Sequence, residues 1–144
     1  MIVIRDVMFA NRRSYGELLT HSEEGIASNI LADRLKRLTA AGLLSWEPDP
    51  HHRQKGIYSL TEPAIQLVPL LAHMGAWGCR HTRPSRELSV RAELLEKGGI
   101  SLWNAFMDEL RHLHLGAPRP VRSVFDELRA AYEKALGRRT RGGT

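Results

Sequence analysis

The sequence predicts a mainly α-helical protein that contains one small two-stranded β-hairpin and ends in a C-terminal helical extension. Apolar residues recur at helical spacing along most of the chain, and two short apolar runs at 43–47 and 57–61 flank a polar stretch rich in turn-forming residues. With 144 residues, 42% hydrophobic and 26% charged, the chain can bury a core and lacks the composition of a disordered protein.

Three helices are predicted before the hairpin. Residues 2–10, IVIRDVMFA, have the pattern of a buried or amphipathic helix. Ser14, followed by Glu17, forms a capping-box pattern for a second, short helix. Gly25 interrupts the chain, and Ser28 can cap a third helix that runs to about residue 41. The predicted inward face of this third helix consists of Ile30, Leu31, Leu35 and Leu38.

The hairpin has predicted strands at 43–47 and 57–61, joined by a polar loop. A long helix follows, capped by Thr61 and kinked by Pro69, because an interior proline removes a hydrogen bond and clashes with the preceding turn. Further helices are predicted at 86–97, 101–114 and 121–136. We expect a domain at 1–80 that includes the start of a long dimerisation helix, a helical extension at 81–138 for dimerisation or packing, and a flexible tail at 139–144.

This order of elements is that of the winged helix-turn-helix, in which the third helix enters the major groove of DNA and the hairpin loop reaches the flanking groove or phosphates. The predicted partner is double-stranded DNA. The net charge is +5, but residues 1–60 carry 8 basic against 7 acidic side chains. The prediction therefore depends on where the basic residues lie.

Basic and polar residues fall on three parts of the motif that would face DNA. Asn29 can present its amide to an adenine edge, whereas Lys36 and Arg37 can contact phosphates. Asp33 repels phosphate unless it accepts from cytosine or pairs with a neighbouring arginine. Any one of these side chains alone is more often an ordinary solvated group. The predicted DNA-binding residues are Arg12, Arg13, Ser14, Ser28, Asn29, Asp33, Lys36, Arg37, His52, Arg53 and Lys55.

Several segments resemble the HxlR-type family of winged helix-turn-helix regulators, within the MarR-like superfamily. They are IRDVMF, RRSYGEL, ILADRLKRL followed by AAGLL, and YSLT leading into LVPLL and AWG, within residues 1 to about 78. The resemblance implies a homodimer, palindromic operator DNA and control of genes that respond to reactive or toxic small molecules. Family members usually have some twenty residues before the position of Met1, so either an upstream segment precedes Met1 or this protein lacks it, and in both cases the first helix is cut short. The extension from about residue 100 exceeds the family's usual end.

The predicted dimer surface lies on the long helix after the hairpin, at Leu67, Leu70, Leu71, Met74 and Trp77. These apolar residues surround much of the helix, so either the C-terminal helices or a second copy covers them. We favour the dimer because twofold symmetry would place two recognition helices about one DNA turn apart. A second apolar stripe fits core or dimer surface better than a ligand pocket, and consists of Leu102, Trp103, Phe106, Leu110 and Leu113.

Cys79 is the single cysteine, and Arg80 and His81 could favour its thiolate in a redox sensor, although a structural cysteine is the simpler interpretation. The histidines lack the spacing of a metal site. We expect no metal, no cofactor, no catalytic residues and no enzymatic activity. Without a signal peptide or membrane span, we expect a cytoplasmic protein. The predicted function is a homodimeric DNA-binding repressor that responds to a small-molecule or stress signal, and the alternative is a winged-helix protein-interaction module.

Overall fold

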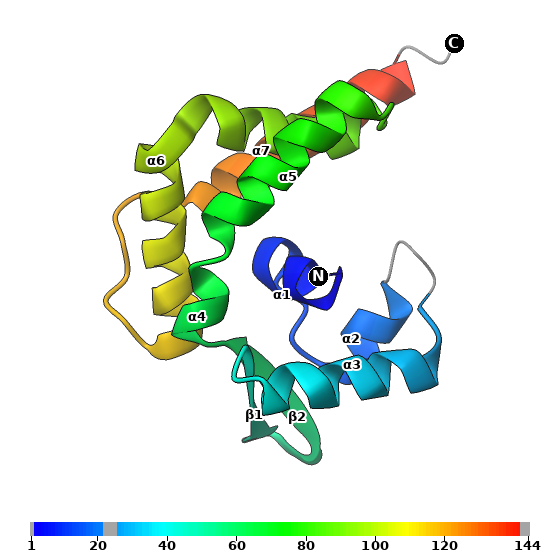
Figure 1. Ribbon diagram of the computed structural model, residues 1–144, viewed down its shortest axis with the longest axis vertical. Coiled ribbons are helices and arrows are strands. Elements are labelled where there is room, and N and C mark those ends of the chain that lie inside the picture. The colour runs from blue at the N-terminus through cyan, green and yellow to red at the C-terminus, as the bar shows by residue number, and fades with distance from the viewer. Residues whose placement is uncertain (1, 22–25, 142–144) are drawn as a thin grey trace. The chain divides into compact units, whose positions relative to one another are not determined.

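The computed structural model in Figure 1 describes residues 2–21 and 26–141, and Gly25 lies outside them. It consists of helices joined to one antiparallel hairpin, which confirms the predicted fold class. Two compact units divide the chain: one holds residues 1–66 and 113–117, and the other holds 67–112 and 118–144. The division therefore falls before the boundary expected at residue 80. The elements of the first unit up to the hairpin are α1 (Ile2–Ala10), α2 (Tyr15–Thr20), α3 (Ser28–Ala40), β1 (Leu44–Asp49) and β2 (His52–Leu60).

The start of α2 agrees with the capping pattern. The Ser14 hydroxyl accepts a hydrogen bond from the Glu17 N–H at 3.2 Å, which satisfies one of the free donors of the first turn. The prediction that Ser28 caps α3 is wrong, because Ala27 occupies the N-cap position and Ser28 is the first helical residue. The Ser28 hydroxyl is instead hydrogen-bonded to the Tyr15 hydroxyl, which links α2 to α3.

The buried face of α3 is narrower than predicted. Leu31 and Leu35, one turn apart, are fully buried, and Leu38 is half-buried. Ile30 was expected to point inward, but its side chain is 45% exposed. Successive helical residues are about 100° apart around the axis, so burial of Leu31 turns its neighbour Ile30 toward solvent.

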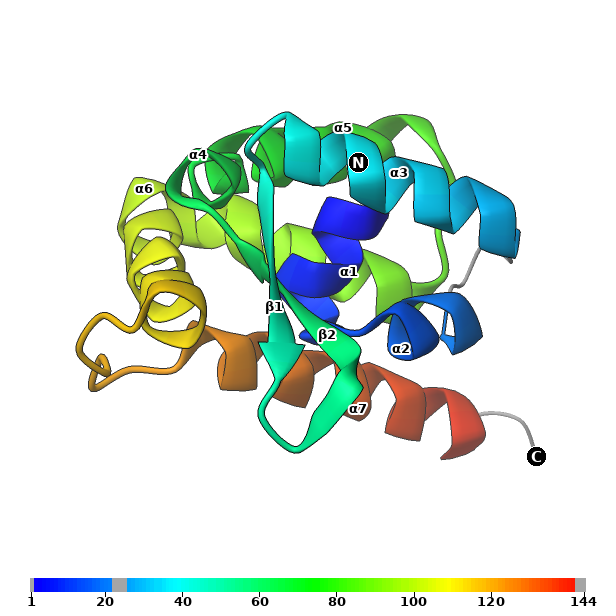
Figure 2. The same ribbon diagram turned by 90° about the horizontal axis from the view of Figure 1, so that it is seen from below.

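The hairpin is longer than its apolar runs. β1 and β2 pair from Leu44 with Leu60 to Pro48 with Gly56, and then Asp49 pairs with His52. Residues 52–56, expected in a loop, therefore belong to β2: His52 and Gly56 pair with β1, and residues 53–55 lie between these two pairs. Between these last two pairs, β1 advances by one residue, from Pro48 to Asp49, while β2 advances by four, from His52 to Gly56. In Figure 2 this hairpin extends beyond the helices of its own unit.

The long helix predicted after the hairpin is two helices, α4 (Glu62–Ile65) and α5 (Val68–His81). Pro69 was expected to kink a continuous helix, but it lies in the first turn of α5, where its missing N–H costs no hydrogen bond. None of the helices in the described part of the chain is long and apolar enough to cross a membrane.

The second unit is completed by most of α6 (Arg86–Leu115) and by α7 (Val124–Arg141). Gly99 interrupts α6 with a left-handed backbone, φ 59°, so the two helices predicted on either side of the glycine pair are joined at a kink. The Trp103 indole N–H donates to the Leu95 carbonyl at 2.8 Å and satisfies an acceptor just before the kink. The tail was expected to begin at residue 139, but residues 139–141 are helical.

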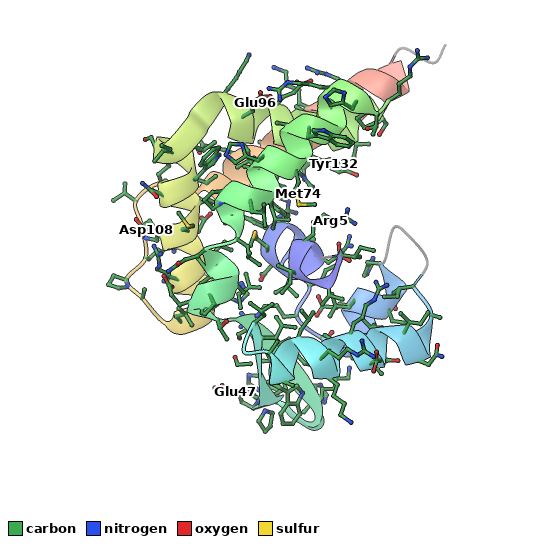
Figure 3. All side chains as sticks on the ribbon, viewed as in Figure 1. Arg5, Glu47, Met74, Glu96, Asp108 and Tyr132 are labelled. Atoms are coloured by element: carbon green, nitrogen blue, oxygen red, sulfur yellow. The ribbon has the colours of Figure 1, made fainter. Side chains whose placement is uncertain are left out.

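Two side chains of α6 hold α7 in place. The Glu109 carboxylate accepts from the Phe125 N–H at 2.7 Å, which satisfies a donor at the start of α7. Farther along, the Arg91 guanidinium lies 4.2 Å from the ring centre of Tyr132, which is labelled in Figure 3. Buried apolar side chains of α5, α6 and α7 include Ala72, Leu95, Leu102, Phe106, Leu110, Val124 and Leu128.

Candidate nucleic-acid interface

The outer face of α3 is exposed and mostly basic or polar. Asp33 and Arg37, one turn apart, form an ion pair with 3.0 Å between carboxylate and guanidinium. The pairing that would make Asp33 compatible with a DNA-facing helix is therefore present. Among the described residues, Arg34 and Lys36 have no hydrogen-bond or ion-pair partner. The exposed side chains are Ser28, Asn29, Ile30, Ala32, Asp33, Arg34, Lys36 and Arg37.

Arg13, predicted to contact phosphate, has its guanidinium directed into the first unit. Its Nε donates to the Tyr58 carbonyl at 3.0 Å, and its Nη2 donates to the Ser59 hydroxyl. Burial lowers the pKa of Arg13, and the carboxylate of Glu47, labelled in Figure 3, opposes that shift. Since the Arg13 backbone also accepts from the Tyr58 N–H at 2.7 Å, this residue joins the turn before α2 to β2.

Arg12 also has partners within the protein. Its Nη1 donates to the carbonyl of His21, at the C-terminal end of α2, at 2.7 Å, and lies 4.0 Å from the buried carboxylate of Asp6. These contacts hold α1, α2 and the intervening turn together. A pair of arginines before a helix looks the same in sequence whether it serves DNA or the fold, so no sequence signal could have revealed this placement.

The hairpin tip carries the predicted wing residues. His52 and Lys55 are exposed, and the side chain of Arg53 lies outside the described part of the structure. Asp49 accepts from the His51 N–H at 2.9 Å, a side-chain-to-backbone bond that shapes the turn. Trp46, which sequence reasoning did not select, is 48% exposed and lies over Gly56. The sequence contained a signal for this contact, because Gly56 has no side chain and so leaves room for a ring on the hairpin.

The first unit also receives a segment from far along the chain. The Leu60 N–H at the end of β2 donates to Nδ1 of His114 at 3.1 Å, and Arg13 donates to the Leu113 carbonyl at 3.3 Å. Burial and the nearby Arg13 charge lower the pKa of His114 to about 4. We call residues 113–117 the anchor segment. Sequence reasoning missed it because it joins a strand end to a residue 54 positions away.

Four of the five residues predicted to form a dimer surface lie on α5, and Leu67 is the N-cap residue of this helix. Leu70, Met74 and Trp77 are 49–61% exposed, whereas Leu67 and Leu71 are half-buried. Spacings of four and three residues place the exposed three on one helical face. Met74 is labelled in Figure 3. Because large apolar side chains are costly in water, this face is a candidate contact surface.

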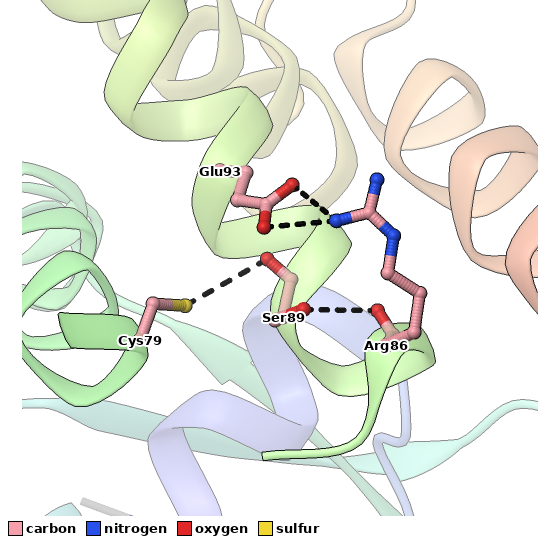
Figure 4. Close-up of polar contacts among 4 residues, drawn as sticks. All are labelled: Cys79, Arg86, Ser89 and Glu93. Carbon is pink, nitrogen blue, oxygen red and sulfur yellow. Dashed lines mark hydrogen bonds and ion pairs between the residues drawn. The ribbon is translucent and has the colours of Figure 1, made fainter. Parts of the chain in front are cut away.

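Cys79 is half-buried in the second unit, with its sulfur 3.8 Å from the Ser89 carbonyl (Figure 4). Its predicted activators have other partners: Arg80 pairs with Glu96, and the ring of His81 lies 5.0 Å from the ring of Trp77. No cluster of three or more His, Cys, Asp or Glu side chains able to hold a metal ion occurs in the part of the chain that the structure describes.

A helix-turn-helix followed by a β-hairpin, with a basic and polar outer face on the third helix, defines a winged helix-turn-helix protein of the DNA-binding regulator class. Within this class, the chain belongs to the HxlR-like helix-turn-helix family, whose model matches residues 1–86. The comparisons with curated proteins and with solved structures give no match.

Proposed function

We propose that this protein is a homodimeric, sequence-specific transcription regulator that binds a palindromic operator and represses the adjacent promoter in response to a small-molecule or stress signal. The observation that carries the proposal is the outer face of α3, where polar and basic side chains extend from a helix-turn-helix of the HxlR-like family. In such motifs the third helix reads base edges in the major groove.

The side chains of α3 divide by chemistry. Asn29, in the first turn, can donate to and accept from an adenine edge, and Ser28 beside it can reach a base or phosphate. The exposed Ile30 suits contact with a thymine methyl group. Arg34 and Lys36 can neutralise phosphates without first losing a partner, whereas Arg37 must share its charge with Asp33.

The tip of the hairpin supplies a second contact with DNA through His52, Arg53 and Lys55. These residues lie at the register shift between the two strands. Basic side chains there suit the phosphates or minor groove beside the recognition helix. Arg13 is left out because its donors are bonded inside the protein, and Arg12 and Ser14 act by fixing α2.

Binding to DNA is tested by fluorescence anisotropy with duplexes from the region upstream of the protein's own gene. Asn29→Ala should relax sequence preference, while Lys36→Ala should weaken binding to specific and nonspecific duplexes alike. Lys134→Gln, an exposed change on α7, serves as the control. Equal losses on every operator variant with Asn29→Ala would refute its assigned role, and the absence of any DNA binding would refute the function.

The dimer is proposed to form through the exposed face of α5, with Leu70, Met74 and Trp77 packing against the same residues of a second copy. A twofold arrangement buries these side chains on both copies and pairs two recognition helices. Light scattering at micromolar concentration should give the mass of a dimer, and Met74→Lys should give a monomer. A wild-type monomer at these concentrations, with or without operator DNA, would contradict the proposal.

A second candidate function is a winged-helix module that binds another protein and not a specific DNA sequence. The exposed Ile30 and Trp46, together with the nearly neutral charge of residues 1–60, favour it. Under this alternative, anisotropy would show the same weak binding to all duplexes. Ile30→Ala would then leave DNA affinity unchanged, whereas the regulator predicts a selective loss on operators with thymine at the contacted position.

A further inference from the structure

A cavity of about 260 Å³ lies within the second unit, between α6 and the start of α7. Four leucine and valine side chains line it: Leu94 and Leu102 from α6, Val124 and Leu128 from the α7 side. Three of these four are less than 5% exposed, so the wall is fixed by packing. Its volume is just below the roughly 300 Å³ at which drug-sized ligand pockets begin. The space therefore suits a single-ring or short branched molecule.

Three charged residues also line this cavity, and all three are exposed: Lys97, Arg122 and Glu127. Arg122 and Glu127 satisfy each other through two hydrogen bonds of 2.9 and 3.0 Å. Lys97 also lines the cavity, is exposed, and has no hydrogen-bond or ion-pair partner within the described ranges. An apolar wall with one uncommitted ammonium group at its edge favours a molecule with an apolar body and a single negative charge.

The cavity wall crosses the kink of α6. Lys97 and Gly98 precede Gly99, and Leu102 follows it. A molecule bound here would touch both halves of a helix whose bend depends on the left-handed backbone of Gly99. The second half of α6 continues to Leu115, and its last residues belong to the first unit, where the Leu113 carbonyl accepts from Arg13 and His114 Nδ1 accepts from the Leu60 N–H.

We infer that this cavity is a binding site for a small apolar monocarboxylate, with the apolar body on Leu94, Leu102, Val124 and Leu128 and the carboxylate on Lys97. The ligand favours one bend at Gly99, and the second half of α6 transmits that preference to the anchor segment beside β2. This regulatory consequence rests on the proposed DNA-binding function, whereas ligand binding itself does not.

Binding is tested on the full chain by isothermal titration with cyclohexanecarboxylate, using cyclohexylmethanol as the neutral probe of similar shape. Saturable binding of the acid is expected, with the alcohol weaker. Lys97→Gln should weaken acid binding about fivefold, the value of an exposed ion pair of about 1 kcal/mol, and leave alcohol binding unchanged. Lys134→Gln, a matched lysine on α7, should change neither. Equal affinity for acid and alcohol, no saturable binding, or equal effects of the two lysine variants would overturn the site.

A second measurement tests the coupling. Anisotropy with duplex DNA is repeated with saturating cyclohexanecarboxylate, and DNA affinity should change at least threefold in wild type but not at the same acid concentration in Lys97→Gln. An unchanged affinity in wild type, with acid binding shown by titration, overturns the coupling. If the protein binds no DNA, the proposed function fails while the titration still decides the site.

Discussion

The backbone N–H of Leu60 donates a hydrogen bond to Nδ1 of His114 at 3.1 Å. Nδ1 can accept only when it carries no proton, so the ring is neutral and its proton lies on Nε2. Nε2 is buried and has no partner among the described residues. Burial disfavours the charged form of the ring, and protonation would place a second charge near Arg13, so the pKa of His114 is lowered to about 4.

The first prediction is a loss of stability in mild acid. His114 has a pKa of about 4 when folded, against an ordinary value of 6.5, so the unfolded chain binds the proton more tightly. The neutral His114 ring therefore contributes to the free energy of unfolding above pH 6.5. This contribution, roughly 3 kcal/mol in total, is lost as the pH falls from 6.5 toward 4. Urea unfolding between pH 4.5 and 7.5 measures this loss. In His114→Asn, whose amide oxygen can still accept from Leu60, the slope should be shallower, and identical slopes would contradict the assignment.

The second prediction separates Arg13 from the DNA-binding residues. Arg13→Ala leaves the Tyr58 and Leu113 carbonyls and the Ser59 hydroxyl without their donor, so the free energy of unfolding should fall by about 3 kcal/mol. The salt dependence of DNA binding, measured at a temperature where the variant remains folded, should not change. If Arg13→Ala kept the stability of the wild type and lowered the salt dependence of DNA binding, Arg13 would contact phosphate, as first predicted from the sequence.

The third prediction is the converse for Arg34, which is exposed and without a partner in the described ranges. Arg34→Ala should change the free energy of unfolding by less than about 0.5 kcal/mol. The slope of log affinity against log salt should fall by about 0.9 for each phosphate that the arginine neutralises. Arg129→Ala, on α7 and paired with Glu133, provides the control of equal charge change. An equal effect of both variants would indicate that bulk charge, and not a direct interaction of Arg34 with DNA, sets the slope.

The fourth prediction concerns Trp46 and Gly56. A Cβ at position 56 would lie 1.6 Å from the indole nitrogen of Trp46, so Gly56→Ala must displace the ring from the hairpin. We expect a loss of about 1 kcal/mol in the free energy of unfolding, and a red-shifted tryptophan emission relative to wild type. In a Trp46→Ala background the same glycine change should cost much less, and a double-mutant cycle without coupling would show that the ring does not occupy this position.

The sequence predicted those parts of the fold that depend on local pattern. Ser14 and Glu17 were recognisable because a cap and its N–H partner lie three residues apart. The prediction that Ile30 points inward was wrong, because helical periodicity shows which side of a helix is buried but not how wide the buried face is. Arg13 and His114 could not be placed from sequence, since their partners lie 45 to 100 residues away and depend on how the chain returns. Family membership was also readable, because its motifs are contiguous.

The register shifts between Pro48 and Asp49, so residues 53–55 of β2 have no partner on β1. The regular pairs, from Leu44 with Leu60 to Pro48 with Gly56, do not include positions 53–55, so substitutions at these positions leave the regular pairs intact. The side chains at these positions can therefore be varied with little risk to folding.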